Sequence, residues 1–155
     1  METKTIEQSA TFRAPPMDVY EMLMDSKKHA ALSGEPAAIS REVGGRFSAW
    51  GTHISGFNLA LRPGQKIVQA WRALDWPTDH YSIAIFELNA ADGGTKLDFT
   101  QIGVPAYRYE GHCRGWTQTY WTPMKEILER GSTSDQTRAN VEAARRRIQT
   151  GSLEP

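Results

Sequence analysis

The sequence predicts an α+β fold in which a curved antiparallel β-sheet wraps around one long helix near the C-terminus. Two observations predict it. Between Ala37 and Gly103, short segments of alternating apolar and polar residues are separated by turns that contain glycine or proline, which is typical of antiparallel strands. From Tyr107 to Arg130, apolar residues recur every three or four positions, as on one face of a helix. A sheet covered by such a helix buries both apolar surfaces.

The first 36 residues are predicted to hold one strand and two short helices. Thr3–Arg13 alternates in polarity and is expected to be an edge strand that ends before Pro15. The next helix would run to Ser26, with Asp18 in its first turn, where a negative charge complements the helix dipole. A second helix is expected at Ser26–Leu32, before a segment that contains Gly34.

The middle of the chain is predicted to form antiparallel strands joined by turns. Pro63 and Gly64 mark one turn, because proline presets its own φ and glycine tolerates a positive φ. A hairpin is expected around a loop at Asn89–Gly94. The expected strands are Ala37–Ser40, Arg46–Trp50, Ile54–Leu61, Lys66–Ala73, His80–Leu88 and Thr95–Ile102.

The predicted long helix, Tyr107–Arg130, carries most of the aromatic residues in the second half of the chain. At about 1.5 Å per residue it would be roughly 36 Å long. Pro123 should bend it or break it into two segments, since proline lacks an N–H and clashes with a preceding carbonyl. Its apolar face comprises Tyr109, His112, Trp116, Tyr120, Met124 and Ile127, with Trp121 and Leu128 beside it.

The last 25 residues, 131–155, are polar and are interpreted as a helical extension to a domain at residues 1–130. Ser134 would cap a helix from Asp135 to about Gln149. Arg145–Arg147 would then lie near its C-terminus, where basic residues complement the dipole. An anion-binding or nucleic-acid-binding patch is the alternative interpretation of these arginines.

The composition argues against several classes of function. With 18 basic and 18 acidic side chains among 155 residues, the chain has no net charge that would favour nucleic acid. No apolar run approaches the ~20 residues needed to span a bilayer, and the first ten residues lack a secretion signal. A single cysteine, Cys113, excludes an internal disulfide. We therefore expect a globular protein of the cytoplasm.

Motifs for catalysis, metals or cofactors are not evident in the sequence. His112 and Cys113 are adjacent, but neighbours on a helix point about 100° apart, and the other histidines show no metal-ligand spacing. The glycine pairs Gly44-Gly45 and Gly93-Gly94 lack a phosphate-binding context and are interpreted as turns. We expect no metal, no cofactor and no assembled catalytic group. Trp76 lies in a loop that could form the rim or lid of a cavity.

An ordered set of residues carries a resemblance to a known family. It comprises Gly45-Arg46-Phe47, Gly56, Pro63, Ile67, Trp71, Thr95-Lys96-Leu97, Val104-Pro105, Gly115-Trp116, Trp121 and Leu128. Together they resemble the Aha1-type domain of bacterial proteins named for the activator of the heat-shock-protein-90 ATPase, within the START-like (SRPBCC, Bet v 1-like) superfamily. The resemblance implies the helix-grip fold and covers roughly Thr3–Arg130. Nothing in these residues corresponds to the separate N-terminal domain through which the eukaryotic co-chaperone makes most of its chaperone contact.

The START-like resemblance implies a cavity between the sheet and the long helix, where such proteins commonly hold hydrophobic molecules. The apolar candidates for its lining are Trp50, Trp71, Phe86, Phe99, Trp116 and Tyr120, and the polar candidates are Tyr81, Gln101, Tyr109 and His112. An ordinary aromatic core is the alternative, because aromatic side chains bury large areas whether or not a ligand is present.

Three functions follow from these observations, and the sequence leaves all three open. The first is non-enzymatic binding of a small hydrophobic ligand, favoured by the aromatic helix face without an assembled catalytic group. The second is a co-chaperone role in the stress response, in which the protein docks on a heat-shock-protein-90-type ATPase. The third is a cyclase or hydrolase that acts on a buried substrate. A homodimer formed through an edge strand or the C-terminal extension is also left open.

Overall fold

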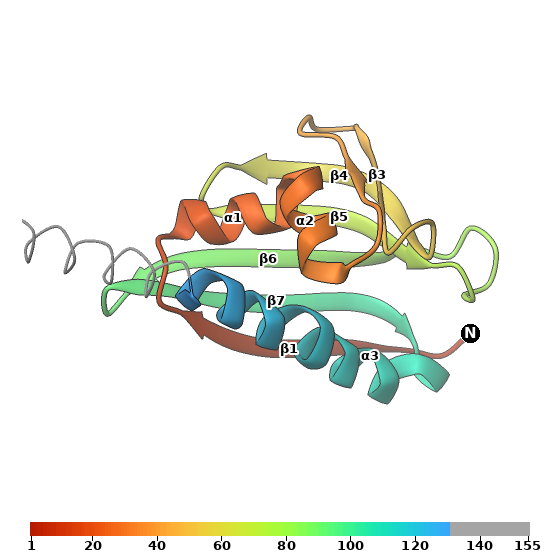
Figure 1. Cartoon of the computed structure of the whole chain (residues 1–155). Coiled ribbons are helices and arrows are strands. Elements are labelled where there is room, and N and C mark those ends of the chain that lie inside the picture. Colours follow the sequence, from red (N-terminus) through yellow and green to blue (C-terminus); the bar gives the residue numbers. More distant parts are fainter. Residues whose placement is uncertain (131–155) are drawn as a thin grey trace, which may run out of the picture.

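The computed structural model describes residues 1–130. It consists of a seven-stranded antiparallel sheet that is covered on one face by helices (Figure 1). The strand order is β1-β7-β6-β5-β4-β3-β2. The α+β helix-grip architecture predicted from the sequence is therefore confirmed. The strands are β1 (Thr3–Phe12), β2 (Ala38–Ile39), β3 (Arg46–Ala49), β4 (Ile54–Arg62), β5 (Lys66–Ala73), β6 (Ser82–Ala91) and β7 (Gly94–Pro105). The predicted C-terminal extension and its three arginines lie outside the described residues.

The first strand lies at one edge of the sheet, as predicted. β1 pairs with β7, the last strand among residues 1–130, so that Ile6 is opposite Gln101 and Ala10 is opposite Leu97. The inward residues Ile6, Ala10 and Phe12 are buried, whereas their neighbours face solvent. This pairing places the N-terminus beside Pro105, where the chain enters the long helix, and the end of β1 beside Thr95 (Figure 1).

The β6–β7 hairpin differs from the prediction. The expected loop at Asn89–Gly94 is mostly strand, because β6 continues to Ala91 and β7 begins at Gly94. Asp92 and Gly93 alone form the turn, and both have positive φ, 46° and 78°. An Asp-Gly pair with two positive φ angles is the turn that matches the twist of a hairpin. The strands are therefore longer than expected, and His80 lies outside β6.

Two short helices, α1 (Pro16–Met24) and α2 (Ser26–Ser33), pack on the same face of the sheet as the long helix (Figure 1). The side chain of Asp25 caps α2 by accepting a hydrogen bond from the Lys28 backbone N–H, and Gly34 ends α2 with φ of 75°. Such N-caps satisfy donors that the first turn leaves unpaired. α1 buries Val19, Tyr20, Met22, Leu23 and Met24.

The long helix, residues 109–130, is continuous through Pro123 rather than broken there. It follows a 3-10 turn (Ala106–Arg108) and comprises α3 (Tyr109–Gly115), a π-helical segment η2 (Trp116–Trp121) and α-helical residues 122–130. In η2 the Thr122 N–H bonds to the carbonyl of Thr117, five residues back. This wider turn directly precedes Pro123, where a regular helical hydrogen bond cannot form. It also places Trp116 above Trp121, with stacked rings 5.5 Å apart.

The core lies between the long helix and the inner face of the sheet. Phe86, Phe99, Trp116 and Trp121 form a cluster of edge, tilted and stacked contacts, with ring centroids 4.3 to 6.5 Å apart. Trp76 also belongs to the core and is 4% exposed. It is not a rim or lid, because its loop folds inward and its ring packs on Trp71 at 5.3 Å.

Candidate functional site

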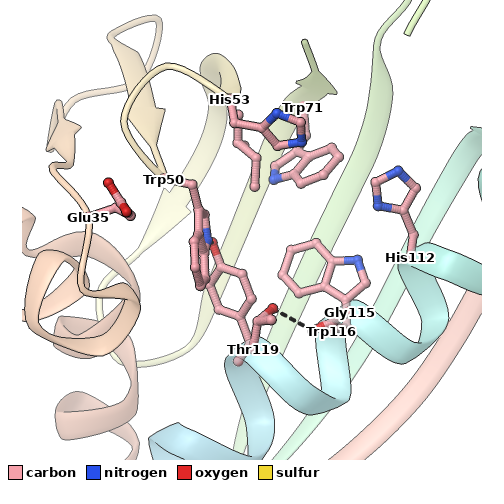
Figure 2. Close-up of a pocket in the computed structure, with 10 residues that line it drawn as sticks. Glu35, Trp50, His53, Trp71, His112, Gly115, Trp116 and Thr119 are labelled. Carbon is pink, nitrogen blue, oxygen red and sulfur yellow. Dashed lines mark hydrogen bonds between the residues drawn. The ribbon is translucent and has the colours of Figure 1, made fainter. Parts of the chain in front are cut away.

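An open pocket of about 510 Å³ lies at one end of the interior, between the π-helical segment and the β3–β4 and α2–β2 connections (Figure 2). Tryptophan rings from three elements form most of its wall, and Figure 2 shows Trp50 and Glu35 on one side and Trp71, Trp116 and His112 on the other. Its volume suits a small organic molecule. The lining residues are Glu35, Trp50, His53, Ile54, Trp71, His112, Gly115, Trp116, Thr119 and Tyr120.

The deeper interior is almost filled. Ile54, Trp71, Trp116 and Tyr120 line both the open pocket and a second space of only about 20 Å³, which reaches His29. These four side chains therefore separate the pocket from the core. A space of that size is of the order of a single water molecule, so only the outer pocket can accept a larger ligand.

Tyr120 forms the polar part of this partition. Its hydroxyl accepts a hydrogen bond from Trp50 Nε1 at 3.1 Å and lies 2.9 Å from Nε2 of His29. Burial raises the pKa of Tyr120, which stays neutral. Burial lowers the pKa of His29 to about 4, so that this histidine is also neutral near pH 7. The wall between pocket and core is thus uncharged.

His112 occupies the opposite end of the pocket and is held by Trp76. The Trp76 Nε1–H donates to Nε2 of His112 at 3.0 Å. An indole N–H can only donate, so Nε2 must be the unprotonated nitrogen of the imidazole. Burial lowers the pKa of His112, which favours the neutral ring that this bond requires. His112 therefore carries its single ring proton on Nδ1.

Five of the ten residues predicted from the sequence to line a cavity line this pocket: Trp50, Trp71, His112, Trp116 and Tyr120. Phe86, Phe99 and Gln101 are instead buried in the core, where Gln101 accepts from Trp116 Nε1 at 2.8 Å. Phe86 reaches only the small inner space. These side chains do not line the pocket because the aromatic rings fill the interior at their depth and leave no open space there.

Tyr81 and Tyr109 lie away from the pocket. Tyr81 is 37% exposed and does not lie on the inner face of the sheet. Its ring makes an edge contact with Phe57, with centroids 5.7 Å apart. Tyr109 lies near Lys4 of β1, whose ammonium is 5.3 Å from the ring centroid. The prediction for Tyr81 was wrong because it lies just before β6, one residue out of phase with the inward residues Ser82 and Ala84.

Sequence reasoning missed Glu35, His53, Ile54, Gly115 and Thr119. Gly115 was the one residue of these whose position in the sequence could have indicated the pocket. A glycine inside a helical pattern usually has a packing or functional reason. The φ of Gly115, −59°, is ordinary for a helix, and a Cβ added there would meet nothing within 4 Å. Glycine is therefore not required by the backbone at 115, and its missing side chain leaves space beside the pocket.

The remaining polar groups bear on two kinds of chemistry, metal binding and nucleophilic attack. Residues 1–130 contain no group of three His, Cys, Asp or Glu side chains placed to hold a metal ion. Cys113 is half-buried and lies outside the pocket lining. In residues 1–130 no helix has the length and apolar character to cross a membrane.

Comparison with known proteins identifies the family. The family model described as "Activator of Hsp90 ATPase homolog 1-like protein" matches residues 13–129, most of the chain. The chain belongs to this family. An activator of 90 kDa heat shock protein ATPase homolog from Dictyostelium discoideum is 31% identical over 132 residues, 84% of this chain and 34% of that protein. The human activator homolog 1 is 27% identical over 84% of this chain and 38% of its own length.

Solved structures agree with this assignment to the Hsp90-ATPase-activator-like family. An HSP90 activator from Plasmodium falciparum is 28% identical with a TM-score of 0.76, and the match covers 81% of this chain and 96% of that one. The Aha1 dimer from Colwellia psychrerythraea, 15% identical with a TM-score of 0.69 over 81% of this chain and 96% of that one, shares the fold. The chain spans little more than a third of the length of the curated relatives it matches.

Proposed function

We propose that this family member binds a small hydrophobic ligand in the outer pocket without transforming it. The observation that carries the proposal is the open aromatic pocket of about 510 Å³ beside a helical glycine, Gly115. Aromatic walls with a few polar groups are the usual chemistry of ligand sites. Among the polar groups in or behind the wall, Tyr120, His29 and His112 are each hydrogen-bonded to an aromatic partner, which supports a structural role for them rather than acid–base catalysis.

A pocket-filling variant tests this proposal. In Gly115→Leu the new side chain begins where a Cβ meets nothing within 4 Å, and it should occupy part of the pocket. Gly111→Leu is the matched control, because Gly111 lies on the same helix, has the same free space around its Cβ and does not line the pocket. Replacing glycine within a helix should stabilise both variants by roughly 0.5–1 kcal/mol.

The measurement is native mass spectrometry of gently purified protein, together with a thermal-shift panel of lipids and aromatic compounds. We expect a co-purifying or panel compound to bind the wild type and Gly111→Leu and to bind Gly115→Leu at least tenfold more weakly. Equal binding by both variants would place the ligand elsewhere. A wild type that carries no small molecule and responds to no member of the panel would overturn the proposal.

A second function is favoured by the similarity to Hsp90 activators. The Dictyostelium and Plasmodium proteins are named for that activity and align with most of this chain. We propose as an alternative that this domain docks on a heat-shock-protein-90-type ATPase through its outer surface. The test is the ATPase rate of the purified chaperone with an excess of this chain. A rate that does not change over a wide range of chain concentrations would refute a co-chaperone role for this domain.

A further inference from the structure

The pocket presents hydrogen-bond donors at its aromatic wall, and this decides which hydrophobic ligands suit it. Four of the five indole N–H groups are paired: Trp50 with Tyr120, Trp76 with His112, Trp116 with Gln101 and Trp121 with Gln8. Trp71 is the exception, since no group in residues 1–130 accepts from its Nε1–H. Figure 2 shows the nitrogen edge of the Trp71 ring turned toward the space between Trp50 and Trp116.

His112 supplies a second donor at the same wall. Its Nε2 is committed to Trp76, so the proton resides on Nδ1, which has no acceptor among the described residues and is not sealed from the pocket. The ring lies 5.6 Å from that of Trp71, nearly perpendicular to it. Two N–H groups on the same wall of the pocket therefore lack acceptors, and the other walls are largely aromatic. Donors left unpaired in such surroundings favour a ligand that brings an acceptor.

Charge narrows the class of ligand further. None of the ten lining side chains is Lys or Arg, so an anion would have no fixed positive partner in the pocket. A cation could in principle use the faces of tryptophan rings and the carboxylate of Glu35. The N–H groups of Trp71 and His112, however, point the positive ends of their dipoles at a cation near that wall. An uncharged ligand with an acceptor atom needs no positive partner and is not repelled by the N–H dipoles.

We propose that the pocket selects a neutral, flat, conjugated carbonyl compound, such as a fused-ring ketone or quinone, whose carbonyl oxygen accepts from Trp71 Nε1–H, while His112 Nδ1–H offers a second donor on the same wall. This inference rests on the proposed ligand-binding function. The flat ring system packs against Trp50, Trp116 and Tyr120, which are already joined by edge and tilted contacts. Trp71 determines specificity, and Trp76 positions His112 as a donor.

The test compares two probes of nearly equal shape, 9-fluorenone and fluorene, which differ by one carbonyl oxygen. Isothermal titration calorimetry on the full chain measures both affinities, with the flat cation proflavine as a third probe. A hydrogen bond contributes about 1 kcal/mol, so fluorenone should bind about fivefold more tightly than fluorene. Trp71→Phe should abolish this preference while both probes still bind. The matched change Trp121→Phe removes an indole N–H that is bonded to Gln8 outside the pocket and should retain the preference.

A second measurement uses the wild-type protein alone and so does not depend on whether a variant folds. In a ¹H–¹⁵N spectrum of the wild type, fluorenone should shift the free indole N–H resonance of Trp71 downfield and leave that of Trp121 in place. Equal affinity for fluorenone and fluorene, or an unshifted Trp71 resonance, would overturn the inference and leave the proposed function standing. Tighter binding of proflavine than of fluorenone would also overturn it, in favour of a cation site. Binding of no probe would count against the proposed function as well.

Discussion

Acid should destabilise this protein through His29. The side chain is 3% exposed, its Nε2 contacts only the Tyr120 hydroxyl, and its Nδ1 has no partner among the described residues. Burial lowers its pKa from 6.5 to about 4. A histidine held neutral in the folded state takes up its proton more readily when unfolded. The stability is therefore complete above pH 6.5 and is lost as the pH falls toward 4.

The magnitude follows from the two pKa values. A difference of about 2.5 pH units corresponds to a limit of about 3 kcal/mol once both states are protonated. At pH 5 the unfolded state is almost fully protonated at this site and the folded state hardly at all, so the loss relative to pH 8 is about 2 kcal/mol. This is a large fraction of the 5–15 kcal/mol that is typical of small domains.

Urea denaturation at pH 8 and pH 5, followed by tryptophan fluorescence, measures this loss. His29→Gln is the informative variant, because its amide reaches the position of Nε2 and can keep the bond to Tyr120 but does not titrate. The fall in unfolding free energy between the two pH values should be about 2 kcal/mol smaller in the variant than in the wild type. Burial also lowers the pKa of His112, whose contribution has the same sign and remains in both proteins. An identical fall in both would refute the reasoning.

Substitutions at three further positions test the architecture, with unfolding free energy as the measurement. Gly56→Ala should cost about 2–3 kcal/mol, because a Cβ there would lie 1.8 Å from the Ala70 carbonyl oxygen, and wild-type stability would contradict the tight approach of β4 to β5. Asp25→Ala should cost about 1 kcal/mol through the lost cap of α2, whereas Asp25→Asn should restore most of it. Gln101→Leu should cost about 1–3 kcal/mol by leaving Trp116 Nε1–H buried without an acceptor, and a neutral effect would argue against that bond.

The strands and helices could be predicted because each depends on local periodicity and turn chemistry. The alternation along β1 and β5, for example, reproduces the inward and outward residues of the structure. Pro63 and Gly64 form a turn where proline and glycine dictate the backbone. For the hairpin at Asp92 only the predicted strand lengths were wrong. The alternation of apolar and polar residues is lost near the turn, although the two strands remain paired there.

The candidate site was predicted only in part, since aromatic residues look alike in sequence whether they fill a core or line a pocket. Trp71 and Phe99 both face inward, yet Trp71 borders open space and Phe99 is 1% exposed in the core. The difference depends on which rings from distant segments stack between sheet and helix. Sequence spacing carries no information about that packing.

By itself, the sequence determined the order of the strands and helices, the inward faces and the aromatic character of the long helix. Only the tertiary structure decided that the helix adopts a π turn before Pro123, that Trp76 folds inward to hold His112, and that Trp71 is the tryptophan left with a free N–H. The physical reason is that periodicity reflects neighbours three or four residues away. A hydrogen bond between residues 36 positions apart, as from Trp76 to His112, exists only after the whole sheet has closed on the helix.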